Sequence, residues 1–231
     1  MKIENRTKIL HSKNISRIFK LGLFTFLFML VSLYVVNAPR YAIDQILTSE
    51  KQAIFGIIAM PSTIMILLGN FLVQPFLTRL LDRYSNKDKK SFLKIITGLI
   101  SVIIICSIII LTIAYFIGIL VLEFIYGTDL SAELNNLLII ICGATLYTIT
   151  LIISNILIMM RKTGIQLIIY LITAVFAFFI SRILVTIYGL NGGVLFYFVT
   201  MTIQFFLFII VFITSINLDK KLTLCEEANN E

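Results

Sequence analysis

Long apolar runs separated by short polar segments constrain this chain more than any other feature of its sequence. A helix needs roughly 20 mostly apolar residues to cross the hydrocarbon core of a bilayer. Six runs have that length, at about residues 18–36, 53–76, 92–117, 137–159, 164–187 and 194–216. Because lipid offers the backbone no hydrogen-bond partners, such runs cross a membrane as helices. The sequence therefore predicts an all-α, polytopic membrane protein with six transmembrane helices.

The composition agrees with lipid as the surrounding solvent. Hydrophobic residues make up 59% of the 231 residues, and charged residues only 13%. A water-soluble domain of this length would not have enough core to bury so many apolar side chains.

The chain lacks the residue patterns of most enzymes and metalloproteins. His11 is its only histidine, and Cys106, Cys142 and Cys225 do not have the spacing of a metal site or a redox motif. The predicted spans hold no pair of carboxylates, and the sequence has no glycine-rich phosphate loop. We therefore expect no enzymatic activity, no metal and no cofactor.

Lysine and arginine are concentrated on one side of the predicted bundle. With six spans, the leader, the second and fourth connections and the tail share one side. Together they hold all of the 19 basic residues except Arg40, Lys51 and Arg182. Because basic residues accumulate in cytoplasmic loops, both termini are predicted to lie in the cytoplasm, in a multi-pass protein of the inner or plasma membrane. The net charge of +7 then follows from topology and anionic membrane lipids, and indicates no nucleic acid.

The predicted organisation has three parts, a basic leader (1–17), a transmembrane bundle (18–217) and a cytoplasmic tail (218–231). Two glycine-containing segments without lysine or arginine, 126–129 and 188–193, predict turns on the outer side.

The first connection is unusual because the apolar pattern resumes directly after Pro39. We expect the first helix to continue through this proline with a kink, which membrane helices tolerate. Ser49, with Gln52 three residues later, has the form of a capping box and predicts that the second helix begins there. Arg40 and Asp44, four residues apart, then share one face of the first helix in the outer part of the membrane.

Arg40, Asp44 and Arg182 are the ionisable candidates at membrane depth, where a charge costs a few kcal/mol. Two interpretations remain open. In one, Arg40 and Asp44 form an interfacial ion pair and Arg182 extends to the lipid headgroups. In the other, the three residues face a central cavity that an anionic substrate passes, since guanidinium matches phosphate oxygens well.

Asn70 and Gln74 are polar candidates on one face of the second predicted helix, near its cytoplasmic end. Amides at such positions either bond a neighbouring helix or contact a ligand. Such amides more often bond a neighbouring helix, so the residue pattern favours a packing role over a ligand contact.

Several sequence motifs resemble the oligosaccharide flippases of the multidrug/oligosaccharidyl-lipid/polysaccharide exporter superfamily, which translocate polyprenyl-diphosphate-linked sugars for capsule or O-antigen assembly. The most specific motif is Asn37-Ala38-Pro39-Arg40-Tyr41-Ala42-Ile43-Asp44. The others are Phe55-Gly56-Ile57 followed by Met60-Pro61, Phe76-Leu77 followed by Tyr84, Asp88 and Phe92, Phe124-Ile125-Tyr126-Gly127, and Tyr188-Gly189-Leu190-Asn191-Gly192-Gly193.

The resemblance implies one lobe of a MATE-like two-lobe transporter. The family has two lobes of about six helices each, which rock against each other around a shared site, and these motifs are similar to the second lobe only. The chain is then a truncated or split gene product, one subunit of a two-chain transporter, or a self-associating half. Its expected partners are a lipid-linked oligosaccharide, membrane lipids, and a separate N-terminal lobe or a second copy. Arg40, Asp44 and Arg182 would line the headgroup route, with Asn70 and Gln74 below them.

Two alternatives remain. The first is a lobe of a cation-coupled drug exporter of the same superfamily, for which Asp44 is the available membrane carboxylate. The second is a non-transporting membrane subunit of a polysaccharide-synthesis complex, whose partners would be glycosyltransferases or a polymerase.

Overall fold

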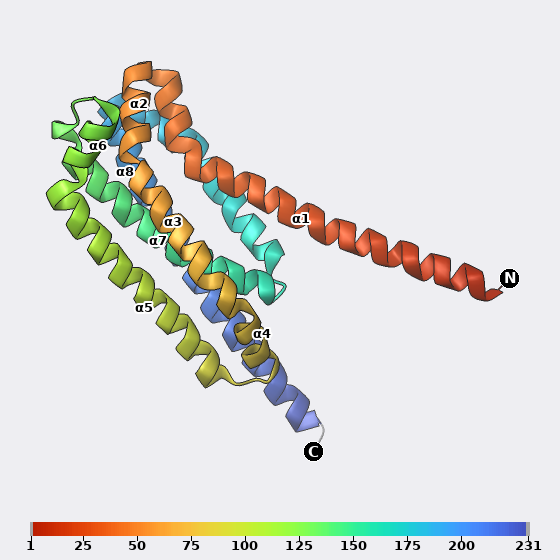
Figure 1. The fold of residues 1–231 in the computed structure, drawn as a ribbon. Helices are drawn as coiled ribbons and strands as arrows, with labels where there is room; N and C mark the ends of the chain where they lie inside the picture. Colours follow the sequence, from red (N-terminus) through yellow and green to blue (C-terminus); the bar gives the residue numbers. More distant parts are fainter. Residues whose placement is uncertain (1, 230–231) are drawn as a thin grey trace.

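The chain is a bundle of long helices in a computed structural model that describes the backbone of residues 2–229 and the side chains of Phe19 and of residues 22–217. No strand occurs in this described part. The order is α1 (Lys2–Ile46), α2 (Ser49–Ile58), α3 (Met60–Val73), η1 (Gln74–Phe76), α4 (Leu77–Ser85), α5 (Lys89–Ile113), η2 (Ala114–Gly118), α6 (Ile119–Tyr126), η3 (Ser131–Glu133), α7 (Leu134–Met159) and α8 (Thr163–Asn229). Figure 1 shows the bundle, with the first half of α1 extending away from it.

The all-helical fold confirms the predicted class. Within the described residues, 5 stretches are long and apolar enough to cross a membrane, Gly22–Ile46, Met60–Ser85, Lys89–Tyr126, Ser131–Met159 and Thr163–Asn217. Such helices are compatible with a membrane protein. The predicted leader (1–17) and tail (218–231) lie outside the described side chains.

The first helix continues through Pro39, as expected, and ends at Ile46. The second helix then begins at Ser49, where a helix start was predicted, but the capping residue is Thr48. The Thr48 hydroxyl accepts a hydrogen bond from the backbone N–H of Lys51 at 3.4 Å. An extended residue whose hydroxyl accepts from the third helical N–H is the usual form of an N-cap.

The predicted span 53–76 is not one helix, which corrects the sequence prediction. The chain breaks at Ala59, between α2 and α3, and the apolar helix that follows runs from Met60 to Ser85 through the single 3-10 turn η1. Pro61 explains the break, because proline lacks an N–H and clashes with the preceding turn inside a helix but is favourable in its first turn.

The last stretch, Thr163–Asn217, turns back on itself at Gly189. This residue has φ 59° and ψ −133°, a conformation far from helical and accessible to glycine. Tyr170 packs against Phe208, and Phe176 against Phe196, with ring centroids 5.5 and 6.5 Å apart. Residues so far apart in sequence touch because the chain reverses at Gly189, inside the predicted turn 188–193. We call the segments before and after Gly189 the first and second limbs of α8.

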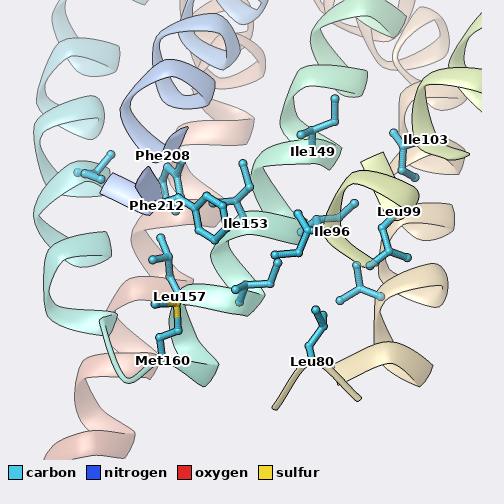
Figure 2. Packing of buried hydrophobic residues seen from close by; sticks show 14 of the residues in the cluster. Leu80, Ile96, Leu99, Ile103, Ile149, Ile153, Leu157, Met160, Phe208 and Phe212 are labelled. Atoms are coloured by element: carbon cyan, nitrogen blue, oxygen red, sulfur yellow. The ribbon is translucent and has the colours of Figure 1, made fainter. Parts of the chain in front are cut away.

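Helix α7 lies at the centre of the bundle and packs against α3, α5 and both limbs of α8. Its membrane-length stretch is the most deeply buried of the candidates. Figure 2 shows part of the largest apolar cluster, in which α7 residues such as Ile153 meet Ile96 of α5 and Phe208 of α8.

Small and hydroxylated side chains allow the helices to approach closely. A methyl group placed at Gly69 of α3 would lie 2.3 Å from Thr148 Cγ2 of α7, and one at Gly143 of α7 would lie 2.9 Å from the Tyr197 ring. The hydroxyls of Ser107 and Thr145 share a 2.6 Å hydrogen bond between α5 and α7. Close contact at small residues and interhelical hydrogen bonds are how helices associate in lipid.

The two ends of the bundle differ in charge. Leu80, Phe92 and Met160 belong to one buried cluster, so the α4–α5 and α7–α8 connections lie at the same end. Exposed basic side chains gather there, and we call it the basic end: Arg79, Arg83, Lys87, Lys89, Lys90, Lys94 and Arg161. At the opposite end, where Leu122, Leu130 and Leu190 share a second cluster, α6 and the connection that follows it carry Glu123, Asp129 and Glu133. We call this the acidic end.

Candidate functional site

Arg40 lies on the part of α1 that reaches the acidic end of the bundle. It precedes Ile46, the last residue of α1, by about 9 Å of helix. The side chain is exposed and turns toward α2. A methyl group placed at Gly56 would lie 3.0 Å from Arg40 Nη2. The absence of a side chain at Gly56 therefore allows the guanidinium to lie against α2.

Two cavities meet at Arg40. The first has a volume of about 200 Å³ and is lined by residues of α1, α2, α3, α7 and the second limb of α8, including Asn37, Thr63 and Tyr197. The second is more open, has a volume of about 410 Å³, and is lined by Ser49, Gln52 and neighbouring residues of α2. Arg40, Gly56 and Met60 line both.

Arg40 is the one charged residue that lines these two cavities. Asn37 Nδ2 donates to the Leu33 carbonyl at 2.9 Å, and Ser62 Oγ donates to the Ala59 carbonyl. The donors of Asn37 and Ser62 are thus partly used within their own helices, whereas the guanidinium forms no hydrogen bond in the described structure. The local charge is positive and favours an anionic ligand.

Asp44 does not pair with Arg40. The ion pair that the structure describes joins Arg83 to Asp88 at 3.2 Å, at the basic end of the bundle. The first of the two open interpretations, an interfacial ion pair, is therefore not found, although both residues lie on α1 near the acidic end. An acidic residue four positions after a basic one is the less favourable order on a helix, and the Arg40 guanidinium is turned toward Gly56 instead.

Arg182 lies on the first limb of α8 and contacts a residue of α1 other than Arg40 and Asp44. Its Nη2 donates to Gln45 Oε1 at 2.8 Å, and its guanidinium carbon lies 4.7 Å from the centre of the Phe178 ring. Arg182 lines neither of the Arg40 cavities. The structure thus places the two predicted arginines in separate surroundings, and Gln45 is a contact that the sequence analysis missed.

Asn70 and Gln74 lie far from Arg40. Asn70 is half-buried on α3 and Gln74 is exposed in η1. Met60 lines both cavities at Arg40, and Gln74 lies roughly 20 Å further along the same helical stretch. Neither amide lines a cavity at Arg40, so the structure does not bring the five predicted site residues into one site.

Buried polar residues inside the bundle were also missed by the sequence analysis. Tyr170, Thr200 and Gln204 are fully buried, at 0% exposure. Two of these residues, Thr200 and Gln204, could have been identified in the sequence, because they are polar residues four positions apart within the last apolar run.

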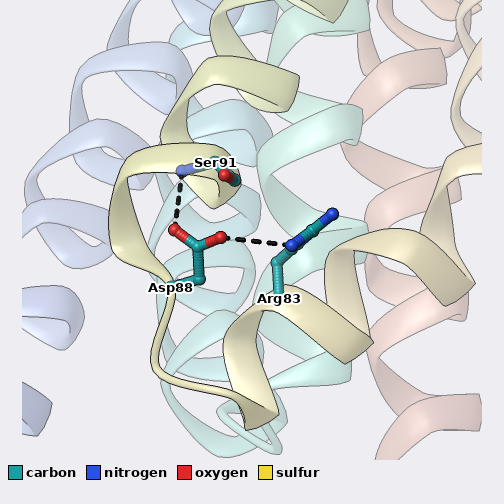
Figure 3. A network of polar contacts seen from close by, with 3 residues as sticks. All are labelled: Arg83, Asp88 and Ser91. Carbon is teal, nitrogen blue, oxygen red and sulfur yellow. Dashed lines mark hydrogen bonds and ion pairs between the residues drawn. The ribbon is translucent and has the colours of Figure 1, made fainter.

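The basic end holds one polar network, shown in Figure 3. Asp88 Oδ1 accepts from the backbone N–H of Ser91 at 3.1 Å and so caps α5, while Asp88 Oδ2 accepts from Arg83 Nη1 at 3.2 Å. The hydrogen bonds from Ser91, and then the Arg83 guanidinium, hold the pKa of the Asp88 carboxyl below its ordinary value. At the acidic end, hydrogen bonds from Ser131 lower the pKa of Asp129 in the same way.

Among the described residues, no group of three or more His, Cys, Asp and Glu side chains is placed to hold a metal ion. Comparison with known proteins found no matching family model, no similar curated protein and no similar solved structure.

Proposed function

We propose that this chain is one lobe of a flippase that moves polyprenyl-diphosphate-linked oligosaccharides across the cell membrane for surface polysaccharide assembly. The observation that carries the proposal is Arg40, an exposed arginine in a bundle of apolar helices and the one charged residue of two adjoining cavities. A diphosphate is a doubly charged anion, and a guanidinium binds phosphate oxygens through directed hydrogen bonds.

In this proposal the bundle crosses the membrane six times, with its basic end in the cytoplasm. The reversal at Gly189 supports two crossings within α8, one for each limb. The basic side chains near Arg83 and Arg161 support the orientation. Tags on the two termini that report from opposite faces of the membrane would contradict it.

In this proposal a partner lobe covers the open side of the second cavity. A lobe of this kind carries only one wall of a substrate path, because alternating access requires a second bundle. The partner is a separate N-terminal lobe or a second copy of this chain. Arg182 and Gln45 would form a second contact on the path, with Asn70 and Gln74 nearer the cytoplasm.

The proposal is tested by translocation of a fluorescent lipid-linked sugar in vesicles that contain the chain with and without a first-lobe partner. We expect translocation in at least one arrangement, a strong loss in Arg40→Ala, and partial recovery in Arg40→Lys, which keeps the charge but not the fork of donors. Unchanged leaflet distribution with the wild-type chain in both arrangements contradicts the proposal. Translocation that survives Arg40→Ala contradicts the role of Arg40.

One observation favours a second candidate, a lobe of a cation-coupled drug exporter. Asp44 is exposed and is not neutralised by Arg40, so its carboxylate remains available for a coupling cation. Drug efflux that depends on an imposed proton or sodium gradient, and is lost in Asp44→Asn, would support this function over lipid translocation.

A further inference from the structure

The interior of the bundle contains buried polar atoms that form no hydrogen bond of ordinary geometry with a protein group. Of the side chains that the structure describes, the buried atoms without a hydrogen-bond partner are Tyr170 Oη, Thr200 Oγ1, and both Nε2 and Oε1 of Gln204. All three residues have 0% exposure. A buried polar group without a partner is unfavourable, and native proteins leave few of them.

These atoms belong to side chains that lie close together. Thr200 and Gln204 are four residues apart, on one face of the second limb of α8. The Tyr170 ring, from the first limb, lies edge-on to Phe208, one turn beyond Gln204, with ring centroids 5.5 Å apart. The Phe28 ring of α1 closes the other side of Tyr170 at 5.0 Å. The Tyr170 ring therefore contacts α1 and the second limb of α8, beside the turn that follows Gln204.

A row of tyrosines leads from this place toward the Arg40 cavity. Tyr147 of α7 and Tyr197 of the second limb are buried in the same cluster. The Tyr147 hydroxyl also lies near that of Tyr170, although the two do not form a hydrogen bond of ordinary geometry. Tyr197 lines the smaller Arg40 cavity and lies one turn before Thr200 on the second limb. Polar side chains thus connect the cavity with the buried atoms.

We propose that Tyr170, Thr200 and Gln204 hold internal water that enters from the Arg40 cavity along Tyr197 and Tyr147. A buried water needs two to four polar partners, and the carboxamide and the two hydroxyls supply both donors and acceptors. The group holds no charged side chain. A cation there would have no counter-charge, and burying an unpaired charge is far more costly than burying a neutral molecule. The proposal does not depend on the proposed transport function.

Radiolytic hydroxyl labelling in lipid nanodiscs tests the proposal directly, because radicals formed from a bound water modify the side chains that contact it. We expect label on Tyr170 in the wild-type chain in spite of its burial. Phe196, which is equally buried but lies in an apolar cluster with Ala38 and Ala177, should stay unlabelled. Label on Tyr170 at the level of Phe196 overturns the proposal.

A pair of glutamine variants gives a second, independent test. Gln166 is also fully buried on α8, but its carboxamide is satisfied by Ser154, which donates to Oε1 at 2.8 Å and accepts from Nε2 at 3.1 Å. Gln166→Leu should lower the unfolding temperature and leave the label on Tyr170 unchanged.

Gln204→Leu distinguishes a hydrated site from a dry one. If water satisfies Gln204, the substitution removes its hydrogen bonds, lowers the unfolding temperature as Gln166→Leu does, and abolishes the label on Tyr170. If Gln204 is dry, leucine removes an unsatisfied polar group and the unfolding temperature rises. A rise, or a label that persists in Gln204→Leu, overturns the proposal.

Discussion

Arg182 Nη2 donates a 2.8 Å hydrogen bond to Gln45 Oε1, which ties the first limb of α8 to the last turn of α1. Interhelical hydrogen bonds in membrane proteins contribute about 0.6 kcal/mol on average and up to roughly 1.7 kcal/mol. Because the donor is charged, we expect a coupling energy of about 1.5 kcal/mol between the two residues. A double-mutant cycle of Gln45→Leu and Arg182→Met, measured by unfolding in detergent, checks this value. Strictly additive effects would contradict the contact.

The Asp88 network gives a pH dependence of stability. Its carboxyl has a lower pKa in the folded protein than the ordinary value of 3.8, chiefly because Ser91 donates hydrogen bonds to it. As the pH falls, the unfolded chain therefore takes up the proton first. The stabilisation is complete above the ordinary value and is lost as the pH falls through the pKa of the folded state.

Asp88→Asn should flatten this pH dependence, because asparagine still caps α5 but does not titrate. We expect the unfolding temperature of the wild-type chain to fall more steeply than that of the variant below about pH 4. Asp82→Asn is the matched control, since Asp82 is exposed on the adjoining α4 and its carboxylate forms no hydrogen bond in the described structure. Parallel curves for wild type and Asp88→Asn would show that the network does not contribute.

The crossing of α3 and α7 at Gly69 gives a prediction about packing. In Gly69→Ala the new methyl group would lie 2.3 Å from Thr148 Cγ2, so the helices must separate or Thr148 must move. Such overpacking costs about 1–3 kcal/mol. Thr148→Ser removes the methyl group in the way and should recover most of the unfolding temperature in the double variant. Gly69→Ala with an unchanged unfolding temperature would contradict the close approach.

The apolar runs predicted the helices well, because spanning a membrane depends on local composition. The turn at Gly189 was also predictable, because glycine is the residue that accepts its positive φ. Prolines were less informative. Pro39 lies inside a continuous helix, whereas Pro61 follows a break, and both stand within apolar sequence. The two prolines differ in whether a new helix begins at them, and the residues next to each proline do not specify this.

The candidate site was harder to predict because its contacts join distant segments. Arg182 and Gln45 are 137 positions apart, and the spacing of Arg40 and Asp44 suggested a pair that the structure does not contain. Tyr170 meets Phe208 of the second limb only because α8 folds back on itself. Periodicity within one helix shows which residues share a face, but it does not show which neighbour covers that face.

Gly56 should matter for transport because it allows Arg40 to lie between the two cavities. In Gly56→Ala the methyl group would lie 3.0 Å from Arg40 Nη2, the flexible end of a long side chain, so a small shift accommodates it. In Gly56→Val the larger side chain should displace the guanidinium. We expect translocation to fall by about tenfold, the effect of losing a charge-assisted hydrogen bond worth ~1.5 kcal/mol.

Gly98→Val on α5 is the matched control, since nothing lies within 4 Å of a methyl group there. Equal translocation rates in the two valine variants, both with wild-type unfolding temperatures, would show that the position of Arg40 against α2 has no part in transport.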